Sequence, residues 1–346
     1  MTDINFFWIA FGYILLAEVL ILPISYFISK YVNLSELLEG NTEGSNPLKV
    51  MAERDMKQVN KTAKVMKVLG YVAVYAFLFF MAVIILFPFY WMLISSVKGY
   101  EEYNRITPTL WPEVIHWENY AKALEAANLE RVFLNTVFVG IVSTLLSLVI
   151  TIFSAFAFAR LEFKGKNALF AGLLATMMIP GELFTITNYQ TVFAFGWGNT
   201  AKWGFTILIV PFLVSTFYIY LLRQNFLQIP NELYLAAKVD GVSDFKYLWK
   251  VMIPLALPTI ISITILKMMG AWNTYVWPNL VIKDDNFLLV TNGIRGGDYS
   301  VDGAVDMVNY PVQMAAVAMV SIPLFMVFLF FRKYIMKGVS RSGIKG

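Results

Sequence analysis

Long apolar stretches constrain this chain more than any other feature of its sequence. A helix needs about twenty apolar residues to cross the hydrocarbon core of a bilayer, and the 346-residue chain is 58% hydrophobic and only 14% charged. Its mean hydropathy is +0.64, whereas a soluble domain is about half apolar and a quarter charged. We therefore predict an all-α polytopic membrane protein. Its seven transmembrane helices are expected at residues 6–29, 69–94, 133–159, 168–189, 204–222, 253–276 and 312–331.

The distribution of basic residues predicts how the helices are oriented. Cytoplasmic loops of membrane proteins carry an excess of Lys and Arg. Residues 31–68 hold six basic side chains and the tail after residue 331 holds five, whereas the last loop on the opposite side is rich in Asp. We therefore expect a cytoplasmic C-terminus and, with seven spans, an N-terminus outside. We therefore expect a multi-pass membrane protein.

The composition also excludes several kinds of chemistry. There is no cysteine and one histidine, His116, so disulfides are ruled out and a zinc or haem site is improbable. The net charge of +4 is divided among the loops, which does not favour nucleic-acid binding. The chain has no G-x-x-x-x-G-K-S/T loop, the usual cradle for nucleotide phosphates. We expect no catalytic residues, no metal site, no bound cofactor and no enzyme activity of its own.

A polar linker divides the chain. The segment 40–47 is rich in Gly, Asn, Ser and Pro, a composition that is typical of loops. We predict three parts: an extra N-terminal transmembrane helix at 1–31, a cytoplasmic linker at 32–68, and a core at 69–346.

A short helix is predicted within the cytoplasmic loop at 225–252. Asn231 suits an N-cap, Glu232 falls in the first turn, and Gly241 stands where a helix ends in the left-handed conformation. About nine residues lie between these signals. One face of the helix would carry Leu233, Ala236, Ala237 and Asp240. Either this helix simply covers the end of the bundle, or its small residues let another protein approach closely.

The same loop resembles the cytoplasmic EAA loop of permease subunits from binding-protein-dependent ABC importers. Ala236, Ala237 and Gly241 match its pattern, whereas Leu235 stands where the family usually has Glu. Glu232, one turn earlier, could supply a charge nearby. Further matches to the carbohydrate-uptake branch, similar to the maltose-type second permease, run from about Tyr71 to the C-terminus. They include Ala-Phe-Ala-Phe-Ala-Arg at 155–160, Met-Met-Ile-Pro-Gly-Glu at 177–182, Leu-Arg-Gln-Asn-Phe at 222–226 and Ala-Trp-Asn at 271–273.

This resemblance implies a type I importer permease core of six helices, with residues 1–68 as an addition. It implies that the loop docks on a cytoplasmic ATPase dimer, which holds ATP and Mg. The further partners would be a second permease subunit and an extracellular solute-binding protein, and the cargo a sugar or another small polar solute. The docking residues would be Glu232, Leu233, Ala236, Ala237, Asp240 and Gly241. The alternative is a self-contained channel or secondary transporter.

Five residues are candidates for the substrate pathway. Lys267 lies deep within a span, where a cation is unlikely to face lipid, and Thr274 shares its helix face. The alternative is a structural Lys bonded to backbone carbonyls or to a partner's acid. Trp272 and Asn273 suit a hydroxylated solute, or Trp272 belongs to the interfacial aromatic belt. Pro180 is either a hinge beside the pathway or a packed kink.

Overall fold

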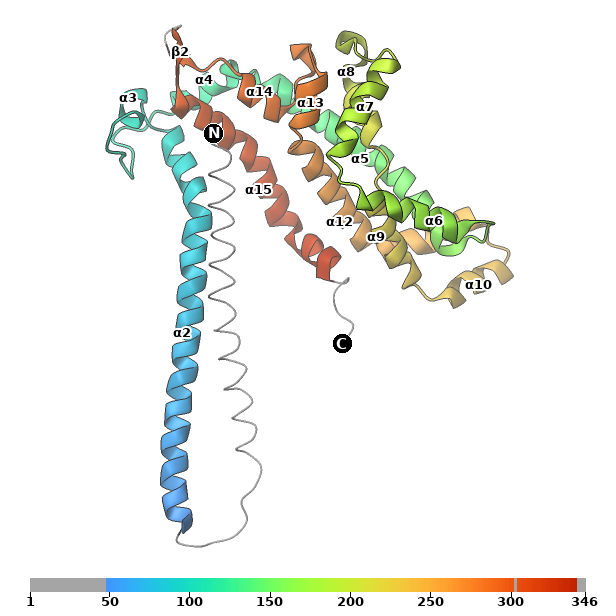
Figure 1. Ribbon diagram of the computed structural model, residues 1–346, viewed down its shortest axis with the longest axis horizontal. Helices are drawn as coiled ribbons and strands as arrows, with labels where there is room; N and C mark the ends of the chain where they lie inside the picture. The colour runs from blue at the N-terminus through green and yellow to red at the C-terminus, as the bar shows by residue number, and fades with distance from the viewer. Residues whose placement is uncertain (1–47, 302–303, 341–346) are drawn as a thin grey trace. The chain divides into compact units, whose positions relative to one another are not determined.

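The computed structural model describes residues 48–301 and 304–340. The predicted first span at 6–29 lies outside these residues. The chain divides into two compact units, residues 1–89 and 90–346. Helix α2 (Leu48–Ser96) provides the described part of the first unit (Figure 1).

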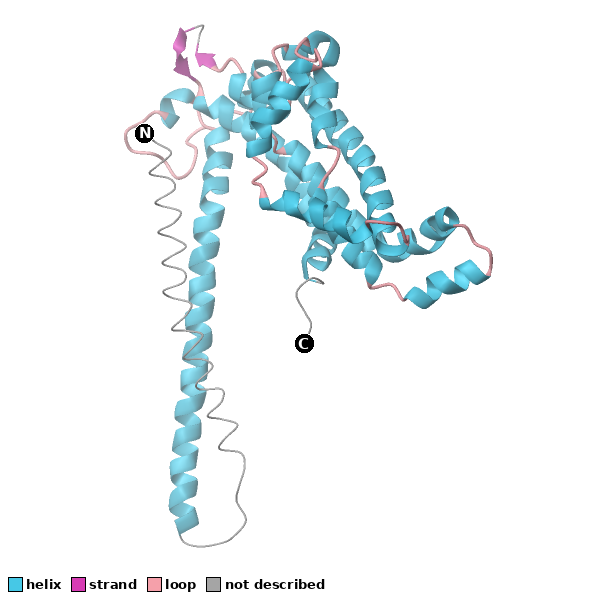
Figure 2. Ribbon diagram, turned by 45° about the vertical axis from the view of Figure 1, so that its right-hand side comes forward, coloured by secondary structure: helices cyan, strands magenta, loops and turns pink. Residues whose placement is uncertain are grey.

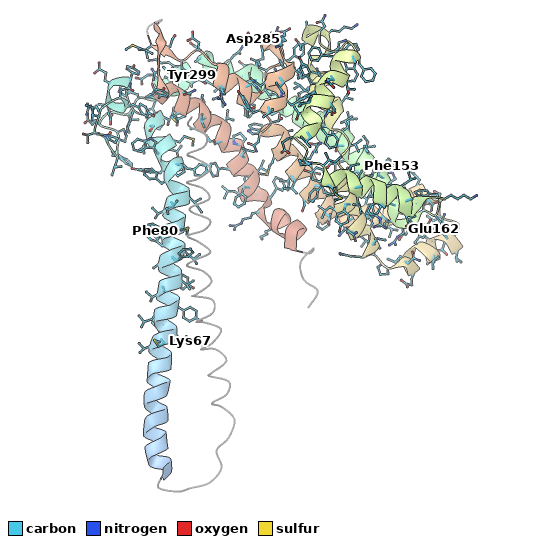
Figure 3. The ribbon with its side chains drawn as sticks, viewed as in Figure 1. Lys67, Phe80, Phe153, Glu162, Asp285 and Tyr299 are labelled. Carbon is cyan, nitrogen blue, oxygen red and sulfur yellow. The ribbon has the colours of Figure 1, made fainter. Side chains whose placement is uncertain are left out.

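Helix α2 is longer than the sequence predicts. Its 49 residues run without interruption from Leu48 to Ser96, so residues 48–68 are helical, although they fall in the predicted linker. The reason is local: this stretch is rich in Lys and Met, which favour helices, and it contains neither Gly nor Pro. Only the part from Val65 onwards is apolar enough to span a membrane. Phe80 is one of the apolar side chains that project from this part of the helix (Figure 3).

The second unit is a helical bundle with one small hairpin (Figure 2). Its first half contains α3 (Tyr100–Tyr103), α4 (Glu118–Ala126), α5 (Leu129–Arg160), α6 (Lys166–Ala175), η1 (Thr176–Met178), α7 (Leu183–Ala194), α8 (Thr200–Ile209), η2 (Val210–Phe212) and α9 (Thr216–Leu227). Its second half contains α10 (Asn231–Val239), α11 (Asp244–Tyr247), η3 (Leu248–Met252), α12 (Ile253–Trp272), α13 (Val276–Val281), η4 (Asp285–Phe287), α14 (Val290–Gly296), β1 (Ser300–Val301), β2 (Ala304–Val308) and α15 (Tyr310–Ser340). The strands pair antiparallel.

The described residues contain four continuous helices that are long and apolar enough to cross a membrane, or six spans if two bent pairs each count as one. The continuous ones are Val65–Ser96, Leu129–Arg160, Asp244–Trp272 and Tyr310–Lys333. The predicted spans at 168–189 and 204–222 are not continuous helices. The first is broken between Met178 and Leu183 with a bend of 106°, and the second between Phe212 and Thr216 with a bend of 46°.

Local sequence explains both breaks. Pro180 and Gly181 follow Ile179, whose backbone is extended with φ −90° and ψ 121°. In the second pair, Pro211 falls in the short η2 turn, and Ser215 is extended with φ −128° and ψ 110°. Proline removes a backbone donor, and both proline and glycine disfavour a continued helix.

Helix α5 is the centre of the bundle and packs against α9 and α12. Its buried small polar residues, among them Ser143, Ser147 and Thr151, let neighbouring helices approach closely. One apolar cluster surrounds Phe226, Tyr247 and Met252 at one end of the bundle. In Figure 3, Phe153 and Glu162 lie towards this end, while Asp285 and Tyr299 mark the other.

Candidate functional site

Helix α10 lies at one end of the bundle (Figure 1) and stands between α9 and α11 in the chain. It has the predicted length of nine residues. At its end Gly241 has φ +68°, and the Gly241 and Val242 amides donate to the carbonyls of Lys238 (3.1 Å) and Ala237 (2.8 Å). These two bonds form a Schellman motif. The predicted left-handed end at Gly241 is therefore confirmed.

The beginning of α10 differs from the prediction by one residue. The N-cap is Pro230, with φ −54° and ψ 135°, and Asn231 is the first helical residue. Because the proline ring fixes φ, Pro230 sets the direction of the helix without a side-chain cap. Glu232 lies in the first turn, where the helix dipole favours a negative charge.

The two faces of α10 divide differently from the predicted pattern. Tyr234 and Ala237 pack inwards against the cluster around Tyr247, so Ala237 does not share the exposed face. The face predicted from spacing is wrong at that residue, because spacing shows which residues are neighbours and not which side is buried. Leu235 is 55% exposed and Val239 is 89% exposed. The other exposed residues of the helix are Asn231, Glu232, Leu233, Ala236 and Lys238.

Polar contacts fasten α10 to α11. The Tyr234 hydroxyl donates to Asp244 Oδ1 over 2.7 Å, and Lys238 Nζ lies 2.7 Å from the same oxygen. The hydrogen bond to Asp244 raises the pKa of Lys238. Ser243 accepts from the Lys246 amide and caps α11. These contacts hold the helix in place, with the apolar side chains of Leu235 and Val239 exposed.

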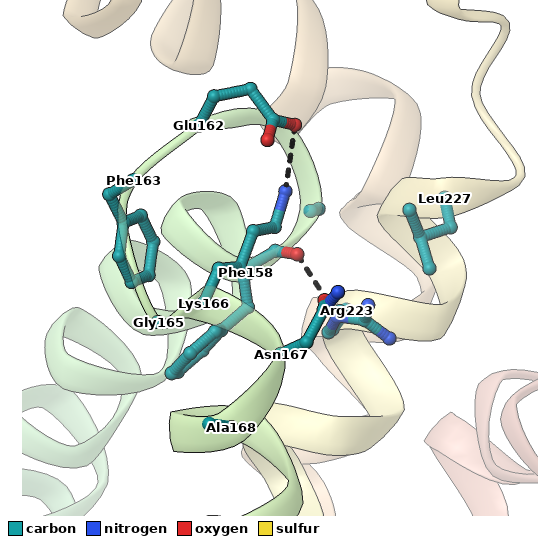
Figure 4. Close-up of a pocket in the computed structure, with 10 residues that line it drawn as sticks. Phe158, Glu162, Phe163, Gly165, Lys166, Asn167, Ala168, Arg223 and Leu227 are labelled. Atoms are coloured by element: carbon teal, nitrogen blue, oxygen red, sulfur yellow. Dashed lines mark hydrogen bonds and ion pairs between the residues drawn. The ribbon is translucent and has the colours of Figure 1, made fainter.

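A polar pocket of about 410 Å³ lies near the same end, between the ends of α5, α6 and α9 (Figure 4). Its charged residues interact within the chain. Lys166 lies 3.2 Å from Glu162, and Arg223 donates through Nε to the Phe158 carbonyl over 3.1 Å. The Arg223 guanidinium also stacks on the Phe170 ring, 4.0 Å from its centroid. The pocket is thus part of the packing around the α9 terminus.

Lys267 lies half-buried on α12 and reaches the broken span beside it. Its Nζ donates to the Phe212 carbonyl over 2.5 Å, at the point where η2 ends. An uninterrupted helix would satisfy that carbonyl with a later amide, and the break prevents this. This contact favours the structural alternative for Lys267.

The other four pathway candidates each contact a different group. Trp272 is 6% exposed and packs edge-on against Phe133, with ring centroids 5.2 Å apart. Asn273 caps α12 through the Met269 carbonyl at 3.0 Å. The Thr274 carbonyl accepts from Thr291 at 2.5 Å. Pro180 is exposed within the 106° break. The structure does not gather these residues into one site.

The sequence did not indicate that the two broken spans contact each other beside their breaks. Thr176 in η1 and Thr216 at the start of α9 place their hydroxyl oxygens 3.2 Å apart. Discontinuous helices at membrane depth occur where the backbone is covered by protein or lines a cavity. Pro180-Gly181 and Pro211 were the available signals, but they mark each break and not their contact.

Broken membrane helices that pack on a central long helix are a feature of many membrane transport proteins. Residues 147–341, just over half of the chain, match the family described as the binding-protein-dependent transport system inner membrane component. The chain belongs to that family. It is accordingly a multi-pass permease of the inner membrane, and this membership does not favour the alternative of a self-contained channel.

Relatives in the same family cover most of the chain. It is 28% identical over 270 residues to the arabinooligosaccharides transport system permease protein of Halalkalibacterium halodurans, covering 77% of this chain and 94% of the relative. It is 29% identical over 268 residues to the diacetylchitobiose uptake system permease protein of Streptomyces coelicolor, covering 78% and 87%. A solved bacterial ABC transporter involved in importing the acidic polysaccharide alginate has the same fold, with a TM-score of 0.67 and 22% identity. It covers 85% of this chain and 99% of that one.

Proposed function

We propose that this chain is a permease subunit of an ATP-driven importer for a sugar or oligosaccharide. It forms half of the translocation pathway, and a second permease subunit forms the other half. Family membership supports the transport role. The relatives named for arabinooligosaccharides and diacetylchitobiose support the class of cargo, which an extracellular solute-binding protein delivers.

In this proposal α10 docks on the cytoplasmic ATPase dimer, which binds ATP and Mg. The observation that carries it is the outer face of α10: Leu235 and Val239 are largely exposed on a helix whose inner face packs on the bundle through Tyr234 and Ala237. Covering these side chains with a partner removes apolar surface from water. Glu232, Leu233, Ala236 and Asp240 belong to the contact, and Gly241 sets where the helix ends. Ala237 packs against the bundle and so supports the helix from its inner face.

The proposed topology has seven spans, with the N-terminus outside and α10 and the C-terminus in the cytoplasm. The basic loops and tail support this orientation. Because the chain has no cysteine, single cysteines introduced at exposed sites report their own side of the membrane. Asn231→Cys, at an exposed position of α10, should react with a membrane-impermeant maleimide only after the membrane is permeabilised.

A tryptophan on the outer face of α10 tests the docking function. Ala236 is exposed, so Ala236→Trp should leave the bundle folded while preventing close approach of the ATPase. The assays are co-purification of the ATPase in detergent and ATP-dependent uptake in proteoliposomes with the binding protein. Leu78→Trp, at a 53% exposed position of α2, is the matched control and should keep both properties.

The two function classes give opposite results. A permease of the proposed kind loses the ATPase and its uptake in the Ala236→Trp variant. A channel or secondary transporter keeps its uptake in that variant, and in the wild-type chain it transports without any ATPase. Either of these last results would refute the proposal.

A further inference from the structure

Two arginines cross between the ends of α5 and α9 in opposite directions. Arg160, the last residue of α5, donates from Nη2 to the carbonyls of Phe226 (2.9 Å) and Ile229 (2.5 Å). In the reverse direction, Arg223 of α9 donates from Nε to the Phe158 carbonyl of α5 (Figure 4). Each helix end therefore holds the backbone of the other, and we call this pair of contacts the arginine clamp.

Arg160 is the buried half of the clamp. Its side chain is 8% exposed and lies beside the apolar cluster that contains Phe226, Ile229 and Tyr247. A buried cation is costly unless it is hydrogen-bonded, and the C-terminal carbonyls of a helix carry the negative end of its dipole. The end of α9 supplies these acceptors. Arg160 is thus fixed in place by the groups that it holds.

The clamp grips the connection that leads into α10. Ile229 directly precedes Pro230, the N-cap of α10, so Arg160 holds the chain two residues before the first helical residue, Asn231. On its other side, α10 packs through Tyr234 and Ala237 onto the same cluster. Because the chain is held on both sides of this connection, a displacement of α10 cannot be taken up by a flexible loop. It must pass into α5, the helix at the centre of the bundle.

We propose that Arg160 is a positioning residue that transmits movement of α10 into α5, so that α10 and the cytoplasmic end of α5 move as one body. This inference rests on the proposed function, in which α10 is the docking site of the ATPase. Arg223 strengthens the connection between α9 and α5 through its bond to the Phe158 carbonyl, at the edge of the polar pocket.

The main test uses the full importer complex in proteoliposomes and measures solute imported per ATP hydrolysed. Arg160→Gln removes the charge and should lower this ratio by about tenfold, the scale of a lost charge-assisted hydrogen bond, while the ATPase stays bound. Both bonds leave a single nitrogen, and a lysine ammonium has three donors. Arg160→Lys should therefore restore most of the ratio.

A merely structural role gives a different result. It would lower the yield and melting temperature of the complex and reduce import and hydrolysis together, so that their ratio would not change. An unchanged ratio in Arg160→Gln overturns the inference. Lys202→Gln, at an exposed lysine of α8, controls for the loss of a positive charge.

A second measurement needs no change at Arg160, and so it decides the matter even if Arg160→Gln fails to assemble. Spin labels are placed at Asn231→Cys, an exposed residue of α10 outside the proposed contact, and at Glu162→Cys just after α5, in a chain that has no other cysteine. If the two elements move as one body, the distance between the labels stays constant when the complex binds ATP. A change in that distance overturns the inference.

Failure of the inference can be told apart from failure of the proposed function. If Ala236→Trp leaves import coupled to ATP, α10 is not the docking site and the proposed function fails. If Ala236→Trp uncouples import, but Arg160→Gln keeps its ratio or the labels separate, only the inference about Arg160 fails.

Discussion

Gly241 ends α10 in a backbone conformation that most side chains resist. A β-carbon built at this residue would meet nothing within 4 Å, so any effect of substitution comes from its φ of +68° alone. Left-handed geometry costs an L-residue about 1–2 kcal/mol, and Asn tolerates it better than β-branched residues do. We expect Gly241→Val to unravel the end of α10 and reduce ATP-dependent uptake, with Gly241→Asn close to wild type. Equal uptake by the two variants would contradict this account.

Lys267 is expected to support the fold and not to select the solute. Lys267→Met leaves the Phe212 carbonyl without its ammonium donor, and loss of a hydrogen bond to a charged group costs about 1.5–3 kcal/mol. Removing a cation from a membrane helix offsets part of this cost. We expect a lower melting temperature in detergent and an unchanged order of solute preference. Lys202→Met is the control for a lost surface lysine. An altered preference at unchanged stability would instead place Lys267 in the pathway.

At the scale of single elements, the sequence predicted α10 well and the fourth and fifth spans poorly. Helix α10 is flanked by residues with strong local preferences, Pro230 at its N-cap and Gly241 just after its C-cap, so local chemistry determines its bounds to within one residue. A hydropathy window averages over about nineteen residues. Such a window does not detect a break of three or four residues, such as residues 179–182. The prolines signalled a disturbance, but its size depends on tertiary packing.

The 106° break should be needed for transport. Replacing both Pro180 and Gly181 by Ala removes the two residues least favourable to helix, with an intrinsic gain of about 4 kcal/mol for a continuous helix. We expect α6 and α7 to straighten, which would increase the distance between spin labels placed on them, and uptake to fall. Gly172→Ala, where a β-carbon meets nothing within 4 Å, is the control within α6. An unchanged label distance would show that packing alone maintains the bend.

At the scale of the whole molecule, the sequence indicated the class of protein but not how its parts are joined. Helical spacing grouped Ala236 with Ala237, yet only Ala237 packs inwards. Arg160 was part of a recognised motif, but its bonds reach residues 66 and 69 positions away. No local pattern encodes such contacts. They follow from the way α5, α9 and α12 pack together.

The part of the chain before the core should be dispensable for the transport cycle. The match to the relative from Halalkalibacterium halodurans takes up 94% of the relative but only 77% of this chain. The relative therefore has few residues left that could correspond to the unmatched part of this chain. We expect a shortened chain that starts at Met56 to insert, to recruit the ATPase and to import solute at the wild-type rate. It keeps all of the membrane-spanning part of α2, which begins at Val65. A chain that starts at Ala82 removes half of that span and should fail to assemble. If the Met56 chain also fails to assemble, the residues before it belong to the structural core of the complex, and the predicted division of the chain is wrong.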